Sequence, residues 1–183
     1  MSDFMDLARR RYSLRRFDGR PVADEDLRLI LEAGRLAPTG KNAQPQRILV
    51  VSGDEAMARM ATATPYTFGA PMALVVCYDK DEAWVSDDGH AIGEIDATLV
   101  LCHMVMEATE LGVGSLIVSG YDEATLRAAF EVPDSYGVAA CLLLGHPTKA
   151  AHPTWRLHDA RKPLGETVFF GSFAQAKHQE NRR

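Results

Sequence analysis

The order of apolar and polar positions along the chain predicts a succession of helices and strands. Apolar residues at helical spacing predict helices over 1–11, from Asp24 to just before Pro38, and over 54–62, 93–111 and 122–130. Short continuous apolar runs predict strands over 47–52, 72–78, 114–119 and 137–145. We expect Asp24 to cap the second helix and Gly112 to end the longest one. Because the strand runs lack polar alternation, the pattern favours a sheet covered by helices on both faces.

The predicted helix over 93–111 is unusual because it is apolar almost all round. A helix at the surface of a globular protein normally keeps a polar stripe, so this one is expected to be buried on every side. In a chain of 183 residues, either the sheet wraps this helix or a second subunit covers it, and we favour a dimer. The apolar positions are Ile95, Leu99, Val100, Leu101, Met104, Val105 and Met106.

Length and composition fit one ordinary globular domain over residues 1–183, ending in a polar tail from about 171 to 183. The longest strongly apolar stretch, Ala97 to Met106, has ten residues, whereas a membrane span needs roughly 20. The N-terminus has no apolar leader. The three cysteines lie in apolar runs without paired spacing, which predicts buried, reduced thiols. We therefore expect a cytoplasmic protein that does not contact membranes.

Charge is unevenly distributed. The net charge is −5, and the segment from Asp79 to Glu123 carries eleven acids against one lysine, a balance of −10. Residues 1–20 carry six arginines against three acids, a balance of +3. One hypothesis for the basic N-terminus is an arm that binds nucleic acid, but the strongly acidic remainder of the protein argues against it. A short cationic segment on an acidic protein instead favours one small bound anion.

The candidate for binding such an anion is the segment RRRYSLRRF. Arg11, Ser13 and Arg15 alternate, so an extended backbone would point them to the same side. Two guanidinium groups and a hydroxyl on one side suit a phosphate monoester. Taken alone, the segment is also typical of a solvated basic turn, and for an isolated cluster that interpretation is favoured.

A second informative segment is LAPTGKNAQPQ, where a predicted helix ends and a strand follows. Its small and polar residues expose backbone amides, and the Asn42 side chain can both donate and accept hydrogen bonds. This suits the polar edge of a flat heterocycle. The alternative, a plain helix-to-strand turn, would be favoured if this segment stood alone.

Other familiar sites do not match the sequence. The segment from Gly34 to Asn42 lacks the spacing of a P-loop, and no serine-hydrolase elbow is present. His146, His152 and His158 lie in an irregular segment without neighbouring Cys or Glu, so no metal site is predicted.

Taken together, these segments resemble the flavin-dependent nitroreductase family over nearly the whole chain. RRYSLRRF resembles the family's flavin-phosphate motif, and APTGKNAQPQ resembles its Pro-Ser-x-x-Asn-x-Gln-Pro turn. GEIDATLVLCHMVMEATELGVGSL resembles the long central helix and the glycine turn after it. LLLGHP and RKPLGETVF resemble the late core strand and the C-terminal phosphate-contacting segment.

The resemblance implies an α+β fold, with a central, mostly antiparallel sheet flanked by helices, in an interlocked homodimer with FMN at the interface. It implies that the FMN phosphate, ribityl chain and pyrimidine edge contact Arg11, Tyr12, Ser13 and Arg15. Arg161 and Lys162 would complete the phosphate site. The other subunit would contribute Pro38, Thr39, Gly40 and Asn42. The backbone of Gly114, Ser115 and Leu116 would lie against the ring.

The activity implied is hydride transfer from NADH or NADPH to flavin N5 and then, in ping-pong order, to a small electron acceptor such as a nitroaromatic, quinone or conjugated alkene. No side chain is expected to be catalytic, since the flavin carries the chemistry. Residues 116–118 read Leu-Ile-Val where the family often has Trp-Ile-Gly, which weakens any inference about the acceptor. The alternative hypothesis is a flavin-binding protein, a sensor or FMN reservoir, without efficient turnover.

Overall fold

The computed structural model describes residues 3–153 and 155–173. The chain forms two compact units, residues 1–152 and 153–183. The single domain over 1–183 stays a prediction, and most of the expected polar tail, residues 174–183, lies outside the described residues.

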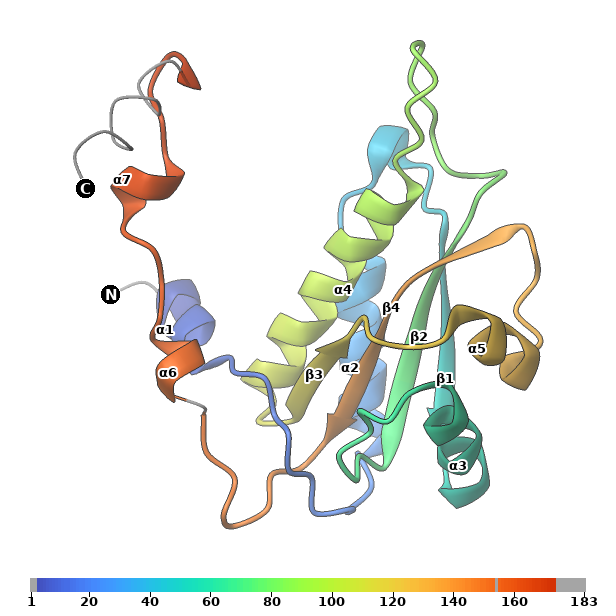
Figure 1. Ribbon diagram of the computed structural model, residues 1–183, viewed down its shortest axis with the longest axis vertical. Helices are drawn as coiled ribbons and strands as arrows, with labels where there is room; N and C mark the ends of the chain where they lie inside the picture. The colour runs from blue at the N-terminus through green and yellow to red at the C-terminus, as the bar shows by residue number, and fades with distance from the viewer. Residues whose placement is uncertain (1–2, 154, 174–183) are drawn as a thin grey trace. The chain divides into compact units, whose positions relative to one another are not determined.

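The first unit is built on a four-stranded sheet with the order β1-β2-β4-β3 (Figure 1). The strands are β1 (Gln46–Ser52), β2 (Met72–Asp79), β3 (Gly114–Val118) and β4 (Tyr136–Gly145). All three pairings are antiparallel. The strands agree with the apolar runs to within one residue, so the predicted antiparallel sheet is confirmed.

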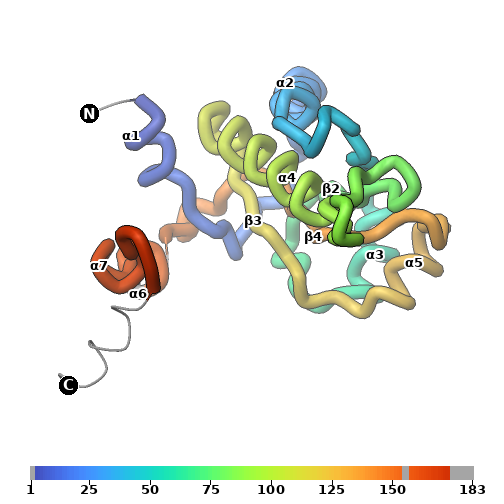
Figure 2. The backbone as a smooth tube through the Cα atoms, turned by 90° about the horizontal axis from the view of Figure 1, so that it is seen from above, coloured from blue at the N-terminus to red at the C-terminus, as the bar shows by residue number. Residues whose placement is uncertain are grey.

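Helices cover both faces of this sheet, as the continuous apolar strands predicted. Alternate residues of β2 point to opposite sides. Leu74 and Val76 pack in one cluster with residues of α2 (Asp24–Arg35) and α4 (Gly93–Glu110). Ala73 and Val75 pack in a second cluster with residues of α3 (Asp54–Ala63) and α5 (Glu123–Phe130). Figure 2 shows the two helical layers on either side of the strands.

The close packing of α2 on α4 depends on Gly34. A Cβ atom at this position would lie 2.8 Å from the Met104 Cγ atom, so only glycine lets the two helices approach this closely.

At the start of α2 the prediction was wrong. The N-cap is Ala23, and Asp24 is the first helical residue and makes no capping bond. Its carboxylate still lies in the first turn, where negative charge is favourable. Gly112 has a φ angle of 75° and follows the end of α4 as predicted.

Within one chain the long helix α4 is not buried on every side, so the sheet does not wrap it, and its cover by a second subunit stays a prediction. Its inner face is formed by residues such as Val100 and Met104. On the outer face Ile95 is 52% exposed and Leu99 is 39% exposed, and Cys102 is also exposed. These three residues follow one another at helical spacing, and we call them the α4 stripe. Cys77 and Cys141 are buried as predicted, but the prediction is wrong for Cys102, which is exposed within one chain. None of the described helices is long and apolar enough to cross a membrane.

The N-terminal segment leads from α1 (Asp3–Arg10) onto the free edge of the sheet at β3. Ser13 pairs in parallel with Ser115, and the Leu14 amide donates to the Ser115 carbonyl at 2.9 Å. The buried Leu14 side chain packs on Gly114, where a Cβ atom would lie 2.2 Å from Leu14 Cδ2. This pairing holds Arg11 and Ser13 beside β3.

The second unit contains two short helices, α6 (Trp155–His158) and α7 (Leu164–Thr167). After α7, the Phe169 and Phe173 rings are in tilted contact, with centroids 5.2 Å apart. Several of its apolar side chains are largely exposed, Phe170 by 85%.

Candidate functional site

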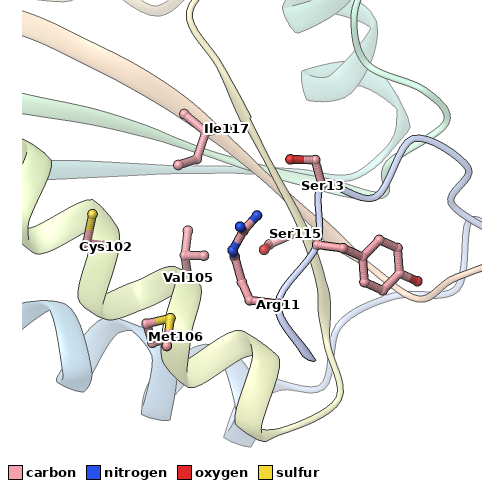
Figure 3. Close-up of a pocket in the computed structure, with 8 residues that line it drawn as sticks. Arg11, Ser13, Cys102, Val105, Met106, Ser115 and Ile117 are labelled. Carbon is pink, nitrogen blue, oxygen red and sulfur yellow. The ribbon is translucent and has the colours of Figure 1, made fainter. Parts of the chain in front are cut away.

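A cavity of about 170 Å³ lies between the C-terminal half of α4, strand β3 and the extended segment 11–13 (Figure 3). One part of its lining is polar and the other part is apolar. The polar lining consists of Arg11, Tyr12, Ser13 and Ser115. The apolar lining consists of Cys102, Val105, Met106 and Ile117. An apolar cavity with a few convergent polar groups is typical of a small-molecule site.

Arg11 is the charged residue of this cavity. Figure 3 shows its side chain between α4 and the β3 residue Ser115. Its neighbour Arg10 is paired with Glu110 at 2.5 Å, whereas no ion pair joins Arg11 to any acid within residues 3–153 and 155–173. A half-buried cation without a counter-ion is costly, and a bound anion would offset that cost. Arg11 thus lies at this cavity as a half-buried charge, and its binding of an anion stays a prediction.

A second hollow of about 100 Å³ adjoins the first and shares Arg11, Tyr12 and Ser115 with it. Gly112 and Gly114 also line it. Burial raises the pKa of the Tyr12 phenol further above neutrality, and the protonated hydroxyl is a hydrogen-bond donor. The two hollows together present donors along the edge of β3.

Two of the predicted residues near this cavity do not line it. Arg15 is exposed, and its guanidinium donates to the Ser13 carbonyl at 3.4 Å. Leu116 is buried in the cluster on the other face of the sheet, because it alternates with Ser115 and Ile117 along β3. Gly114 and Ser115 remain beside Arg11.

The predicted turn Pro38–Asn42 lies at the opposite end of α4. It contains a short 3-10 helix, Gly40–Asn42, and the Gly40 amide donates to Asp96 Oδ1 at 2.9 Å. Asp96 and Met106 are ten residues apart on α4, which corresponds to about 15 Å along the helix axis. One chain therefore does not bring Asn42 and Arg11 into the same cavity.

The remaining predicted residues, Arg161 and Lys162, belong to the second unit and are exposed. Arg161 donates to the carbonyl oxygens of Leu157 and Ala160, at 2.8 and 3.1 Å. Among the described residues, no cluster of three or more His, Cys, Asp or Glu side chains could hold a metal ion.

Comparison with known proteins identifies the family. The model of the nitroreductase family matches residues 8–67 and 63–146, which is most of the first unit. The chain belongs to the nitroreductase family. A crystal structure of a nitroreductase-family protein from Clostridium difficile 630 superimposes with a TM-score of 0.88. It is 36% identical, and the match covers 93% of this chain and 99% of that one.

Two further relatives of this nitroreductase-family chain carry functional names. An Archaeoglobus fulgidus protein, named as a candidate NADH dehydrogenase/NAD(P)H nitroreductase, is 30% identical over 80% of this chain and 87% of its own length. A candidate nitroreductase of Desulfovibrio desulfuricans, crystallised in complex with FMN, is 29% identical with a TM-score of 0.79. That match covers 94% of this chain and 99% of the other.

The sequence motifs did not identify the apolar half of the cavity. Cys102, Val105 and Met106 recur at a spacing of three and four residues on α4, so they share one side of the helix. That spacing is visible in the sequence, but it is equally typical of a helix buried in a core. Asp96 was also missed as a partner of the turn, since nothing local links it to Gly40, 56 residues earlier.

Proposed function

We propose that this protein is an FMN-dependent oxidoreductase that takes reducing equivalents from NADH or NADPH and passes them to a small electron acceptor. The observation that carries the proposal is Arg11, a half-buried guanidinium with no acidic partner among the described residues, in an otherwise largely apolar cavity beside β3. Membership of the nitroreductase family, and the FMN complex of the Desulfovibrio desulfuricans relative, support it.

The residues present fit the two chemically different parts of FMN. Arg11 supplies a planar donor for the phosphate, and the hydroxyl of Ser13 lies on the same lining. Val105 and Ile117 form an apolar surface suited to a flat ring. Arg15, Arg161 and Lys162 are proposed to add positive charge around the phosphate. When bound, FMN supplies the chemistry of accepting and donating hydride, while the protein binds and orients it and excludes water.

The acceptor is proposed to be a nitroaromatic, a quinone or a conjugated alkene. One open face above the cavity would admit the reductant and the acceptor in turn, which is the basis of a ping-pong order. Tyr12 lines the cavity, and its phenol, whose pKa burial raises further above neutrality, is proposed to donate a hydrogen bond to the bound cofactor.

The site is proposed to be completed by a second copy of the chain. The cavity of about 170 Å³ is smaller than the roughly 300–1,000 Å³ typical of ligand pockets. It opens beside the α4 stripe, whose Cys102 also lines it. An exposed apolar stripe next to an incomplete cavity is expected at a subunit interface.

Two-fold symmetry would join the two halves of the site. Asp96, beside the turn, and Met106, beside Arg11, are equally far from residue 101 on α4. If two α4 helices cross in antiparallel orientation near Leu99 and Cys102, the turn of one subunit lies at the Arg11 cavity of the other. Pro38, Thr39, Gly40 and Asn42 would then reach the cofactor from the partner subunit, as the resemblance implies.

The proposal is tested with Arg11→Ala, using Arg16→Ala as the matched control, because Arg16 is exposed and lines neither hollow. Loss of charge-assisted hydrogen bonds worth about 1.5–3 kcal/mol should weaken FMN binding by about 10- to 100-fold. The affinity is measured by titrating the flavin-free protein with FMN and following flavin fluorescence. Equal affinities for both variants would contradict the proposed phosphate site.

Turnover separates the enzyme from a flavin-binding protein that acts as a sensor or reservoir. Anaerobic addition of NADH or NADPH should bleach the flavin absorbance of the wild-type protein faster than that of free FMN. A flavin spectrum that persists would favour the sensor or reservoir instead.

A further inference from the structure

Asp96 is a buried acid to which the proposed function assigns no role. It lies in the first turns of α4 and is 1% exposed. One carboxylate oxygen, Oδ1, accepts the hydrogen bond from the Gly40 amide, and the other, Oδ2, has no hydrogen-bond partner in the described part of the chain. A buried carboxylate held by so few partners costs free energy, so its single long-range bond is the feature to explain.

That bond holds a turn whose backbone is strained. Lys41, Asn42 and Gln44 have φ angles of 53°, 56° and 53°, in the left-handed region that residues other than glycine rarely adopt. Such conformations persist only where the surroundings hold them in place. Within the turn, the backbone amide of Gln44 donates a hydrogen bond to Thr39 Oγ1 at 3.0 Å. The bond from Gly40 to Asp96 joins the turn to α4.

The attachment point is also the point of closest packing. A Cβ atom on Gly40 would lie 2.1 Å from Ile92 Cδ1 and 3.4 Å from Trp84 Cε3. The next residue, Lys41, places its ammonium group 5.8 Å from the centre of the Trp84 ring. The turn is therefore packed against the N-terminal end of α4, and the Asp96 carboxylate fixes its position there.

We propose that Asp96 is a positioning residue that holds the Thr39–Gln44 turn in the conformation that contacts the cofactor of the partner subunit. The inference rests on the proposed function, because it assumes that this turn reaches bound FMN. A carboxylate suits this role because it makes a stronger bond to a backbone amide than a neutral acceptor does. Asp96 itself does not touch the cofactor.

The test compares Asp96→Ala and Asp96→Asn with Glu94→Ala. Glu94 is an exposed acid in the first turn of the same helix, so its replacement makes the same change in charge without touching the turn. Asp96→Asn keeps the shape and an acceptor for the Gly40 amide. Three quantities are measured: hydrogen exchange of the amides of residues 40–44 in flavin-free protein, FMN affinity, and the visible circular dichroism of the flavin at saturating FMN.

For Asp96→Ala we expect amide exchange in the turn to be about tenfold faster and FMN affinity about tenfold lower. The visible circular dichroism should also change at saturation, and Asp96→Asn should show each change to a smaller extent. Glu94→Ala should match the wild type. If Asp96→Ala does not fold, Asp96→Asn carries the test, with an expected loss of affinity of about fivefold because a neutral acceptor binds the amide less strongly.

Two results would overturn the inference. If the Asp96 variants lose thermal stability but show wild-type affinity and wild-type circular dichroism at saturation, Asp96 only stabilises the fold. If exchange in the turn is unchanged, Asp96 does not hold it. A wild-type protein that binds no FMN would instead overturn the proposed function, and with it the role given to Asp96.

Discussion

The two ends of α4 contact different kinds of structure: a segment paired to strand β3 at one end, and a strained turn at the other. At the C-terminal end, Arg11 and Ser13 are placed by strand pairing to β3, and the backbone there is regular. At the N-terminal end, the turn around Gly40 has a strained backbone that depends on one buried acid, Asp96. One end offers a cation that has no acidic partner among the described residues, beside a cavity, and the other offers backbone amides and the Asn42 side chain.

This difference agrees with the proposal that each end supplies only part of the cofactor site. An arginine on a strand edge can bind an anion without further support, because side-chain rotation adapts to the ligand. Backbone donors in a turn have no such freedom, so their direction must be set in advance. We therefore propose that the Arg11 end provides affinity for the phosphate and that the Asp96 end orients the ring.

The largest effect is expected from breaking the proposed dimer interface, because this separates the Arg11 cavity of one subunit from the turn of the other. Leu99→Asp places a carboxylate on the α4 stripe, where the residue is 39% exposed in one chain, so the fold of the subunit should be kept. In the dimer this carboxylate would be buried and unpaired, at a cost of about 3–5 kcal/mol for each subunit. We expect a monomer that no longer retains FMN.

Sedimentation velocity and the absorbance spectrum after gel filtration measure both effects. Ala61→Asp, an exposed position on α3 on the other side of the sheet, is the matched control and should stay dimeric and yellow. A Leu99→Asp protein that is still a dimer would show that the α4 stripe is not the interface.

The sequence predicted the sheet better than the site, for a physical reason. Apolar runs such as Met72 to Tyr78 are buried on both faces, and a run of this kind leaves few alternatives to a central strand. Gly112 ended α4 as expected, because the left-handed backbone there favours glycine. Local composition was enough for these features.

The contacts that organise the site are not local. The bond from Gly40 to Asp96 joins residues 56 positions apart, and Ser13 pairs with Ser115 across about half of the chain. The spacing of apolar and polar residues along the sequence does not predict contacts between residues so far apart. The apolar character of α4 was read correctly, but the sequence could not show which of its faces is covered by the chain itself and which is left exposed.

A smaller effect is expected on the reactivity of the three cysteine thiols, which differ in where they lie. Cys102 is exposed in one chain but would be covered in the proposed dimer, whereas Cys77 and Cys141 are buried in the sheet. Burial raises the pKa of Cys77 to about 11 and that of Cys141 to about 12, so both remain protonated at pH 8. Since the thiolate is the reactive form, neither should react with a thiol reagent in the folded protein.

We expect one thiol, that of Cys102, to react quickly at pH 8 in Leu99→Asp and slowly in the wild-type protein. Release of the chromophore from a disulfide reagent measures the number and rate of reacting thiols, and Cys102→Ser in the Leu99→Asp background is the control. Equally fast labelling of Cys102 in the wild type would contradict its burial between subunits.

The central claim is that each cofactor site takes its two halves from different subunits, and mixing two defective variants tests it most directly. Arg11→Ala and Asp96→Ala are unfolded together in equal amounts, refolded, and titrated with FMN at a concentration that saturates only wild-type sites. Random pairing makes half of the dimers mixed, and one of the two sites in each mixed dimer would have both intact halves. We expect about one quarter of the sites to regain wild-type affinity. If both halves came from the same subunit, no site would be intact, and a mixture that binds no more FMN than the two variants separately would contradict the claim.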